Sequence, residues 1–215
     1  MKKSTAIAPS NIAFIKYWGK LDEALRLPLN DSFSMNLSGA YTTTTVEFSP
    51  SYTKDSVSII GGDFSSDEIS RVVKSLDMIR KISGVTIFAN VVTQNTFPKG
   101  AGAAASASGF AALTIAAFAA LEKPMSEKEL TVFARLGSGS ACRSIPDGFV
   151  EWFSASSSED SYAASLYPST YWEIYDVLAI VDNTMKKVST SQGMESVKTS
   201  PALSERLAAI PGRMT

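Results

Sequence analysis

Two loops of small residues are the parts of this sequence best suited to chemistry. The first, "KGAGAAASAS", carries Lys99 at its front and Ser106 and Ser108 where a helix would begin. A helix N-terminus presents unpaired N–H groups and the positive end of the helix dipole, so such a loop favours phosphate binding. The same composition is common at a tightly packed helix start, and no Gly-Lys-Ser/Thr closes a P-loop here. Taken alone, the loop leaves both interpretations open.

A second loop, "GSGSACR", repeats this design and places Arg143 about one turn into the next helix. Arginine can hold a carboxylate or phosphate through two parallel hydrogen bonds. A third stretch, "NIAFIKYWGK", puts Lys16 inside an apolar run and Lys20 after a glycine. If it is a strand, Lys16 shares a face with the aromatic residues two positions on either side. A lysine there often only extends its ammonium to water. Together, the three stretches predict a pocket for an anionic, phosphorylated small molecule.

The composition limits the other classes of function. The chain has 215 residues, 45% of them hydrophobic, with a net charge of −1, so its overall charge offers no argument for binding nucleic acid or an anionic membrane. It has no histidine, which removes the commonest general base and most zinc sites. The single cysteine, Cys142, cannot form an internal disulfide and fits a reducing compartment. The apolar run 110–121 is too short to span a bilayer, and the N-terminal stretch does not resemble a secretory signal.

The elements that must position these loops alternate irregularly between strands and helices, which favours an α+β fold over a doubly wound sheet. Ser65 and Glu68 have the spacing of a capping box in front of an amphipathic helix. The predicted strands are 41–48, 56–60, 85–94, 148–153 and 175–183. The predicted helices are 67–82, 106–121, 126–136 and a new one near Ala202, with a surface turn at 156–160.

Four motifs carry a resemblance to a known family. "APSNIAFIKYWGK" and "ARLGSGSACRSIPDGFVEW" are highly specific, "NTFPKGAGAAASASGFAAL" is similar to a kinase-type phosphate loop, and "KKVSTSQGM" follows them. Together they resemble the mevalonate diphosphate decarboxylase family of the GHMP kinase superfamily, over essentially the whole chain. The resemblance implies a GHMP kinase N-terminal domain (ribosomal protein S5 domain 2-like) at 1–188. It also implies that 189–215 starts a C-terminal, ferredoxin-like domain that is largely missing.

The resemblance also implies an activity. The family phosphorylates 5-diphosphomevalonate with ATP and Mg²⁺ and decarboxylates it to isopentenyl diphosphate, in the mevalonate pathway of isoprenoid biosynthesis. Positioning and fixed positive charge near the phosphates would carry most of the catalysis. A cytoplasmic protein is expected, binding ATP and diphosphomevalonate but no nucleic acid or membrane. A homodimer, or a partner chain that completes the fold, is expected as well.

Residue roles follow from the resemblance, position by position. The catalytic pair would be Lys16, near the 3-hydroxyl, and Arg143, on the substrate carboxylate. The substrate-binding residues would be Tyr17, Lys20, Ser138, Ser140, Arg143, Thr190 and Met194. The nucleotide-binding residues would be Asn11, Lys99, Gly100, Ala101, Gly102, Ala103, Ala104, Ala105 and Ser106. No residue of the chain is predicted as a metal ligand.

Several positions depart from the family pattern. Ala105 replaces a serine associated with the ATP phosphates and Mg²⁺, while Lys99 replaces a threonine and adds a charge. Ser191 stands where some bacterial members place an arginine on the diphosphate, so the number of phosphates on the substrate is left open. We therefore expect ATP to bind more weakly than is usual for the family, with partial support from Lys99.

The family's catalytic Asp lies in a D-A-G-P-N type motif about a hundred residues beyond the present C-terminus, and no such motif occurs here. Asp22, Asp31, Asp147 and Asp182 do not lie in that pattern. We accordingly expect that these 215 residues alone do not release CO₂. The alternatives left open are a phosphomevalonate decarboxylase, a mevalonate 3-kinase relative, and an inactive fragment that binds nucleotide and substrate.

Overall fold

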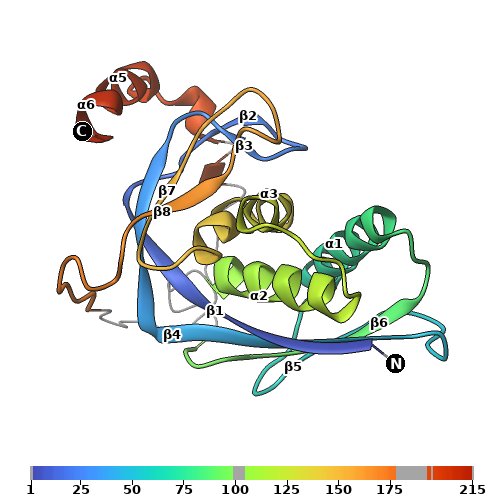
Figure 1. Ribbon diagram of the computed structural model, residues 1–215. Helices are drawn as coiled ribbons and strands as arrows, with labels where there is room; N and C mark the ends of the chain where they lie inside the picture. Colours follow the sequence, from blue (N-terminus) through green and yellow to red (C-terminus); the bar gives the residue numbers. More distant parts are fainter. Residues whose placement is uncertain (1, 99–104, 178–192, 195, 215) are drawn as a thin grey trace.

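The computed structural model describes residues 2–98, 105–177, 193–194 and 196–214. Its centre is a sheet with the strand order β5, β6, β4, β7 and β8, and β1 pairs with β4 beside this path (Figure 1). The strands are β1 (Lys2–Ile15), β4 (Ser32–Ser49), β5 (Ser56–Ile59), β6 (Phe88–Asn95), β7 (Phe149–Trp152) and β8 (Ala163–Tyr167). Among the described pairings of this sheet, only that of β5 with β6 is parallel. The predicted α+β class is confirmed.

The two long strands, β1 and β4, shift register about halfway along. Their pairing is continuous up to Pro9 opposite Tyr41 and then jumps to Asn11 opposite Asn36. Extra residues on one strand bend it and strengthen its twist. Residues 32–35 of β4, which lie on the Asn11 side of the shift, pair with β7. Residues 42–49 of β4, which lie on the Pro9 side, pair with β6. The shift therefore separates the part of the sheet that carries Asn11 from the part that underlies the main core.

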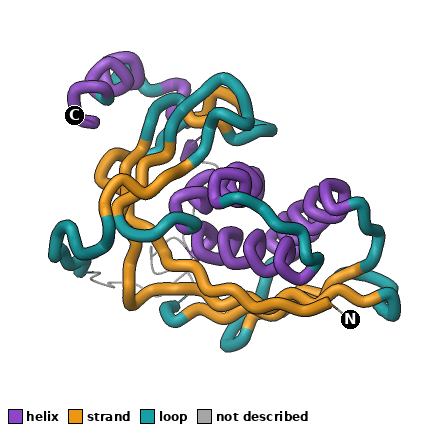
Figure 2. Tube along the Cα trace, viewed as in Figure 1, coloured by secondary structure: helices purple, strands orange, loops and turns teal. Residues whose placement is uncertain are grey.

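Three long helices cover one face of the sheet, as Figures 1 and 2 show. They are α1 (Ser66–Ser83), α2 (Ala105–Ala120) and α3 (Glu127–Gly137). Capping boxes begin two of them, formed by Ser65 with Glu68 at α1 and by Ser126 with Glu129 at α3. In each box the serine hydroxyl accepts from the glutamate's backbone N–H, and the carboxylate accepts from the serine's N–H. These reciprocal bonds explain why both helices begin where the sequence predicts.

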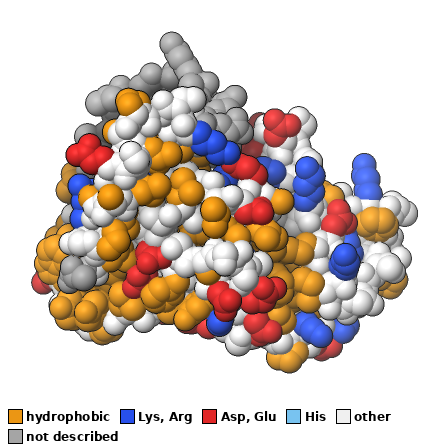
Figure 3. Space-filling model, turned by 90° about the horizontal axis from the view of Figure 1, so that it is seen from above, with side chains coloured by type: hydrophobic (Ala, Val, Ile, Leu, Met, Phe, Trp, Pro, Cys, Tyr) orange, Lys and Arg blue, Asp and Glu red, His pale blue; other side chains and the backbone are white. Residues whose placement is uncertain are grey.

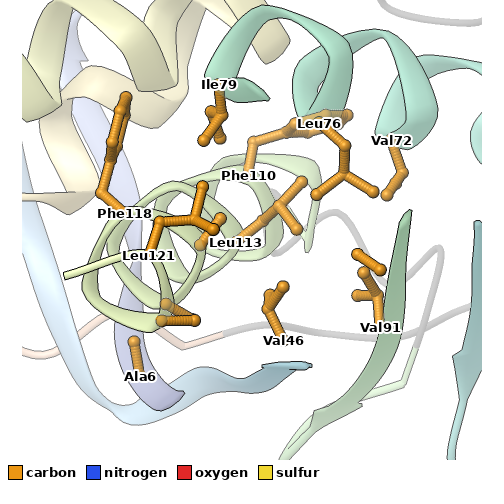
Figure 4. Packing of buried hydrophobic residues seen from close by; sticks show 14 of the residues in the cluster. Ala6, Val46, Val72, Leu76, Ile79, Val91, Phe110, Leu113, Phe118 and Leu121 are labelled. Atoms are coloured by element: carbon orange, nitrogen blue, oxygen red, sulfur yellow. The ribbon is translucent and has the colours of Figure 1, made fainter. Parts of the chain in front are cut away.

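The main core lies between the sheet and these helices (Figure 4). Val46 and Val91 point up from the strands, Leu113 points out from α2, and Leu76 and Ile79 point down from α1. Helix α2 is apolar around its whole circumference, which is typical of a helix buried on all sides. Burying this surface contributes about 25 cal/mol per Å², so α2 and its small-residue start are held firmly.

Smaller elements frame the other end of the sheet. They are β2 (Lys20–Asp22), β3 (Leu27–Pro28), the 3₁₀ helices η1 (Gly139–Ser144) and η2 (Val197–Thr199), α5 (Leu203–Ala209) and α6 (Pro211–Met214). A second apolar cluster lies among them, built from Tyr17, Trp18, Cys142, Val150, Trp152, Ala163 and Met194. This cluster, rather than the main core, underlies the candidate site.

Some expectations need correction. The strand β1 ends at Ile15, so the alternation expected around Lys16 does not extend to that residue. The strand β8 was not predicted, because its small residues give little hydrophobic pattern. In the predicted strand 175–183, residues 175–177 form no strand, since no described strand pairs with them, and the remaining positions lie outside the described residues.

On the face in Figure 3, acidic and basic side chains are interspersed. Within the described part of the chain, every helix is too short or too polar to cross a membrane.

Candidate active site

The two small-residue loops meet in space. Helix α2 begins at Ala105, and the exposed side chain of Ser106 places its Oγ 3.4 Å from Oγ of Ser138, at the start of the second loop. The N-terminal end of a long helix thus opens beside η1. The other predicted phosphate-loop residues, at 99–104, lie outside the described residues.

Arg143 is a buried cation without an acidic partner. Only 3% of its surface is exposed. Its Nη1 donates to Oγ of Ser32 at 2.6 Å and its Nη2 to Oδ1 of Asn11 at 3.2 Å, while its buried Nε has no partner. No carboxylate in the described part of the chain pairs with it. Burial lowers the pKa of Arg143, because desolvation penalises the charged form. A ligand's negative charge would offset that penalty.

Asn11 ties the second loop to β1. Its Nδ2 donates to the carbonyl of Ser140 at 3.1 Å and to Oγ of Ser144 at 2.8 Å, and its Oδ1 accepts from Arg143. The amide is 3% exposed, so these contacts use most of its hydrogen-bonding capacity. These contacts tie Asn11 to Arg143 and the second loop, and the predicted nucleotide binding by Asn11 stays a prediction.

Lys16 and Tyr17, which follow β1, differ in exposure. The side chain of Lys16 is exposed, and its carbonyl accepts from Nδ2 of Asn30 and Nη2 of Arg206. Tyr17 is buried, and its hydroxyl has no hydrogen-bond partner. Burial raises the pKa of Tyr17, and the charge of a nearby arginine opposes this only in part. The phenol is therefore neutral and remains able to donate a hydrogen bond to an anion.

A glycine makes room for that phenol. A Cβ at Gly139 would lie 2.6 Å from the ring of Tyr17 and 2.9 Å from its hydroxyl oxygen, closer than real contacts allow. On its other side the ring packs on Trp152, with the ring centroids 4.5 Å apart. The glycine at this position of the "GSGS" loop is thus needed so that the hydroxyl can lie against the loop backbone.

Lys20 is buried as well, but it has an acidic partner. Its Nζ forms an ion pair with Oε2 of Glu23, whose side chain is half exposed and also lies 3.6 Å from Nζ of Lys198. A hydrogen bond from Lys20 holds the pKa of Glu23 below its usual range. A substrate anion that used Lys20 would have to compete with this carboxylate.

The remaining predicted substrate residues divide into two groups. Ser138 is buried and Ser140 half-buried, both on the second loop, and Met194 packs in the apolar cluster with Tyr17. Thr190 lies outside the described residues. The structure thus brings Tyr17, both serines, Arg143 and Met194 to the surroundings of η1.

Sequence reasoning missed a pair of arginines beside this site. Nε of Arg26 donates to the carbonyl of Leu136 at 3.0 Å, and Nη2 of Arg71 donates to that of Gly137 at 3.1 Å. Both carbonyls belong to the last turn of α3, where helices leave carbonyl groups unpaired. The pair lines a pocket of about 90 Å³ together with Lys74. No spacing rule links a turn residue to a residue of α1, so only the folded chain shows this pair.

Two other chemistries find little support. Burial raises the pKa of the Cys142 thiol to about 12, which makes it a poor nucleophile at neutral pH. Among the described residues, no three His, Cys, Asp or Glu side chains are grouped so that they could hold a metal ion. The described residues therefore suit anion binding rather than thiol chemistry.

Comparisons with known proteins agree with this reading. The family described as "Diphosphomevalonate decarboxylase-like N-terminal domain" matches residues 8–163. The diphosphomevalonate decarboxylase of Ganoderma lucidum is 39% identical over 99% of this chain and 58% of its own length, and that of Homo sapiens is 38% identical over 98% and 57%. The chain thus spans slightly more than half the length of these curated relatives.

Solved structures show the same likeness. A decarboxylase solved in complex with MVAPP, AMPPCP and magnesium is 37% identical, with a TM-score of 0.88, over 99% of this chain and 66% of that one. The Staphylococcus aureus mevalonate diphosphate decarboxylase is also 37% identical, with a TM-score of 0.87, over 99% and 65%. The fold is thus that of the mevalonate diphosphate decarboxylases within the GHMP kinases. The chain belongs to the diphosphomevalonate decarboxylase family, whose N-terminal domain it contains.

Proposed function

We propose that this chain provides the substrate site of an enzyme that uses ATP to decarboxylate 5-diphosphomevalonate to isopentenyl diphosphate. The observation that carries the proposal is the buried Arg143, which is held by neutral partners and has a free Nε. A carboxylate bound there would gain a charge-assisted, forked contact in a low-dielectric setting. Its relatives' activity and the MVAPP complex of a solved relative support this choice of substrate.

The remaining residues take the roles that their positions allow. Arg143 fixes the substrate carboxylate, while Tyr17, Lys20, Ser138 and Ser140 contact the rest of the anion. ATP transfers its terminal phosphoryl group to the tertiary 3-hydroxyl. Phosphate then leaves as the carboxylate departs as CO₂, and the released electron pair forms the double bond of the product. The residues of this chain supply positioning and fixed positive charge for these steps.

The nucleotide site is proposed at the start of α2, with Lys16 and the exposed hydroxyl of Ser106 near the transferred phosphoryl group. Mg²⁺ commonly binds through phosphate oxygens, water and one or two carboxylates. Because no residue of the chain is predicted as a metal ligand, the proposed ion is held through the phosphates of ATP. Bound there, Mg²⁺ would neutralise phosphate charge.

An assay with carboxyl-labelled diphosphomevalonate tests the reaction. We expect labelled CO₂ and ADP in equal amounts from the complete gene product, and loss of both with Arg143→Met. A matched control is Lys54→Gln, which removes an exposed charge with no recorded contact. ADP formation without CO₂ would instead indicate a 3-kinase. Binding of both ligands without any turnover would indicate a binding protein.

The nucleotide role has its own test at the first residue of α2. Ala105→Ser should tighten ATP binding several-fold, because a hydroxyl there adds one hydrogen bond worth about 0.5–1.5 kcal/mol. Ala105→Gly serves as a control, since it changes the same position without adding a hydroxyl. Equal affinity of the serine variant and the original chain, measured by calorimetry, would mean that this helix start is only a packing feature.

We also propose a cytoplasmic location and association with a second chain. The single buried Cys142 fits a reducing compartment. Tyr171 and Trp172 are more than half exposed and belong to an aromatic cluster, a surface type found where chains meet. A homodimer is the simplest assembly, and the mass from sedimentation velocity would decide between it and a monomer. A boundary near residue 188 between two domains stays a prediction.

A further inference from the structure

A pocket beside the candidate active site is lined by three cations. Arg26 lies in the turn between β2 and β3, while Arg71 and Lys74 lie on α1. The pocket measures about 90 Å³, well above the roughly 10–15 Å³ that one water requires. Ser75, Met78 and the end of α3 complete the lining, and none of these lining residues is acidic.

Capping of α3 accounts for only part of this arrangement. Each guanidinium has five N–H bonds, yet within the described part of the chain each donates one hydrogen bond, from Nε of Arg26 to Leu136 and from Nη2 of Arg71 to Gly137. Nε of Arg71 is buried without a partner. Most of the donor capacity of this pair therefore remains for a ligand.

The charges around the pocket are poorly balanced. Burial lowers the pKa of Arg71, and the neighbouring charge of Arg26 lowers it further. Glu68 acts in the opposite direction, but its carboxylate already accepts hydrogen bonds from the backbone and hydroxyl of Ser65. No carboxylate forms a recorded ion pair with either arginine in the described part of the chain. An anion with more than one negative charge would relieve this repulsion.

The pocket adjoins the substrate residues. The carbonyl that Arg71 caps belongs to Gly137, directly before Ser138. The charge of Arg26 acts to lower the pKa of the Tyr17 phenol, against the larger effect of burial. Arg26 also shares its small hairpin with Lys20. A diphosphate that reached Tyr17 and Lys20 would therefore lie next to the two arginines.

We propose that Arg26 is a specificity-determining residue that binds the terminal phosphate of a diphosphate ligand together with Arg71. The proposal rests on the proposed function for the identity of the ligand, but its chemistry requires only a diphosphate. Two guanidinium groups can each hold phosphate oxygens through a fork, and Lys74 adds a charge at the rim. A diphosphate offers one more phosphate group than a monophosphate, so under this proposal its terminal phosphate binds the arginine pair while Lys20 contacts the other.

Arg26 has an unusual backbone conformation. Its φ is 52°, in the left-handed region where glycine or asparagine is the less costly residue. This conformation turns the chain from the hairpin turn into β3, and Nε of Arg26 reaches the end of α3 from it. An arginine at a position that favours glycine is consistent with selection for its side chain.

The proposal is tested by titrating the protein with inorganic pyrophosphate and with inorganic phosphate. Arg26→Gln should weaken pyrophosphate binding about tenfold or more, the usual effect of losing a charged contact, and should change phosphate binding much less. Arg26→Lys should recover only part of the loss, because lysine keeps the charge but not the fork. Lys54→Gln, which removes an exposed charge elsewhere, should leave both affinities unchanged.

A capping role alone gives a different result. If Arg26 only caps α3, Arg26→Gln would lower the melting temperature while pyrophosphate affinity stayed the same, and that outcome overturns the proposal. Equal binding of pyrophosphate by the original protein and by both Arg26 variants overturns it too. A pyrophosphate affinity that depends on Arg26, without binding of diphosphomevalonate, would support this pocket and count against the proposed function. If diphosphomevalonate bound the original protein and Arg26→Gln equally tightly, the result would support the proposed function and count against this pocket.

Discussion

Two arginines, Arg80 at the end of α1 and Arg143 in η1, are buried to similar extents but surrounded in opposite ways. Arg80 is 7% exposed and Arg143 is 3% exposed. Arg80 donates to both carboxylate oxygens of Asp55, at 2.8 and 2.9 Å, and to Oδ1 of Asp77. Among the residues that the structure describes, Arg143 donates only to the neutral side chains of Ser32 and Asn11. Within that part of the chain, the charge of Arg80 is neutralised and that of Arg143 is not.

The surroundings set the direction in which each pKa moves. For Arg80, burial acts to lower the pKa, but hydrogen bonds to Asp55 and Asp77 reverse this and the pKa is raised. For Arg143, burial lowers the pKa, and no carboxylate among the described residues compensates. The charge of a buried cation with its own carboxylate is compensated, whereas a buried cation without one is costly until a negative ligand binds. This difference supports, more strongly than burial alone does, the proposal that Arg143 binds a ligand.

The comparison of Arg80 with Arg143 predicts that, of the substitutions considered, one at Asp55 has the largest effect on stability. Asp55→Asn should lower the free energy of unfolding by up to about 3–5 kcal/mol, because the buried Arg80 then keeps only the exposed carboxylate of Asp77 as a charged partner. Asp55 also accepts from the backbone N–H of Ala89 at 2.8 Å, so a second contact weakens. Urea denaturation followed by circular dichroism measures the change.

A matched control is Asp77→Asn, which removes the exposed partner of the same arginine. The Asp77 side chain is 63% exposed, so its loss should cost less than about 1 kcal/mol. If the two variants were equally stable, the buried pair would not be what holds α1 against the sheet, and the comparison between Arg80 and Arg143 would lose its basis.

At Arg143 the prediction concerns affinity rather than stability. Arg143→Met should leave the melting temperature nearly unchanged, because an apolar residue replaces an uncompensated buried charge. The same variant should weaken diphosphomevalonate binding at least tenfold, as a lost charged hydrogen bond costs about 1.5–3 kcal/mol. Calorimetry and thermal melting of one sample provide both values. A large loss of stability with unchanged affinity would assign Arg143 the structural role of Arg80.

Much of the fold could be predicted from local patterns. The capping boxes at Ser65 and Ser126 and the spacing of apolar residues behind them mark α1 and α3, because both signals act within a few residues. The strand β1 was largely missed, since "KKSTAIAPSN" mixes charges, small residues and Pro9. Its fourteen residues form a strand through pairing with β4, which only the complete fold supplies.

The candidate site divides in the same way. Motifs predicted Arg143 and the second loop, because their residue types lie next to one another in the sequence. The partners that define their chemistry come from distant elements, such as Ser32 on β4 for Arg143. The arginine pair could not be predicted for the same reason. Arg26 and Arg71 are 45 positions apart in the sequence and come together only at the end of α3. Proximity of this kind depends on tertiary packing.

The smallest predicted effect is that of a substitution at Glu23. This residue neutralises the buried Lys20 in the way that Asp55 neutralises Arg80, but its side chain is half exposed. Glu23→Gln should strengthen pyrophosphate binding by a few-fold, because the anion no longer competes with a carboxylate for Lys20, and an exposed partner of this kind is worth about 0.2–1 kcal/mol. Glu122→Gln is a matched control, since it removes an exposed carboxylate paired with Lys2.

The lowered pKa of Glu23 predicts how the stability of the Glu23→Gln variant depends on pH. The pKa of Glu23 is held below its ordinary value of 4.5 by the hydrogen bond from Lys20. The pair therefore stabilises the fold above pH 4.5 and loses that contribution as the pH falls through the lowered pKa. Glu23→Gln should be slightly less stable than the original chain at pH 7 and should lose less of its stability on acidification. Weaker pyrophosphate binding by this variant would contradict the competition, and would mean that Glu23 orients Lys20 toward the ligand.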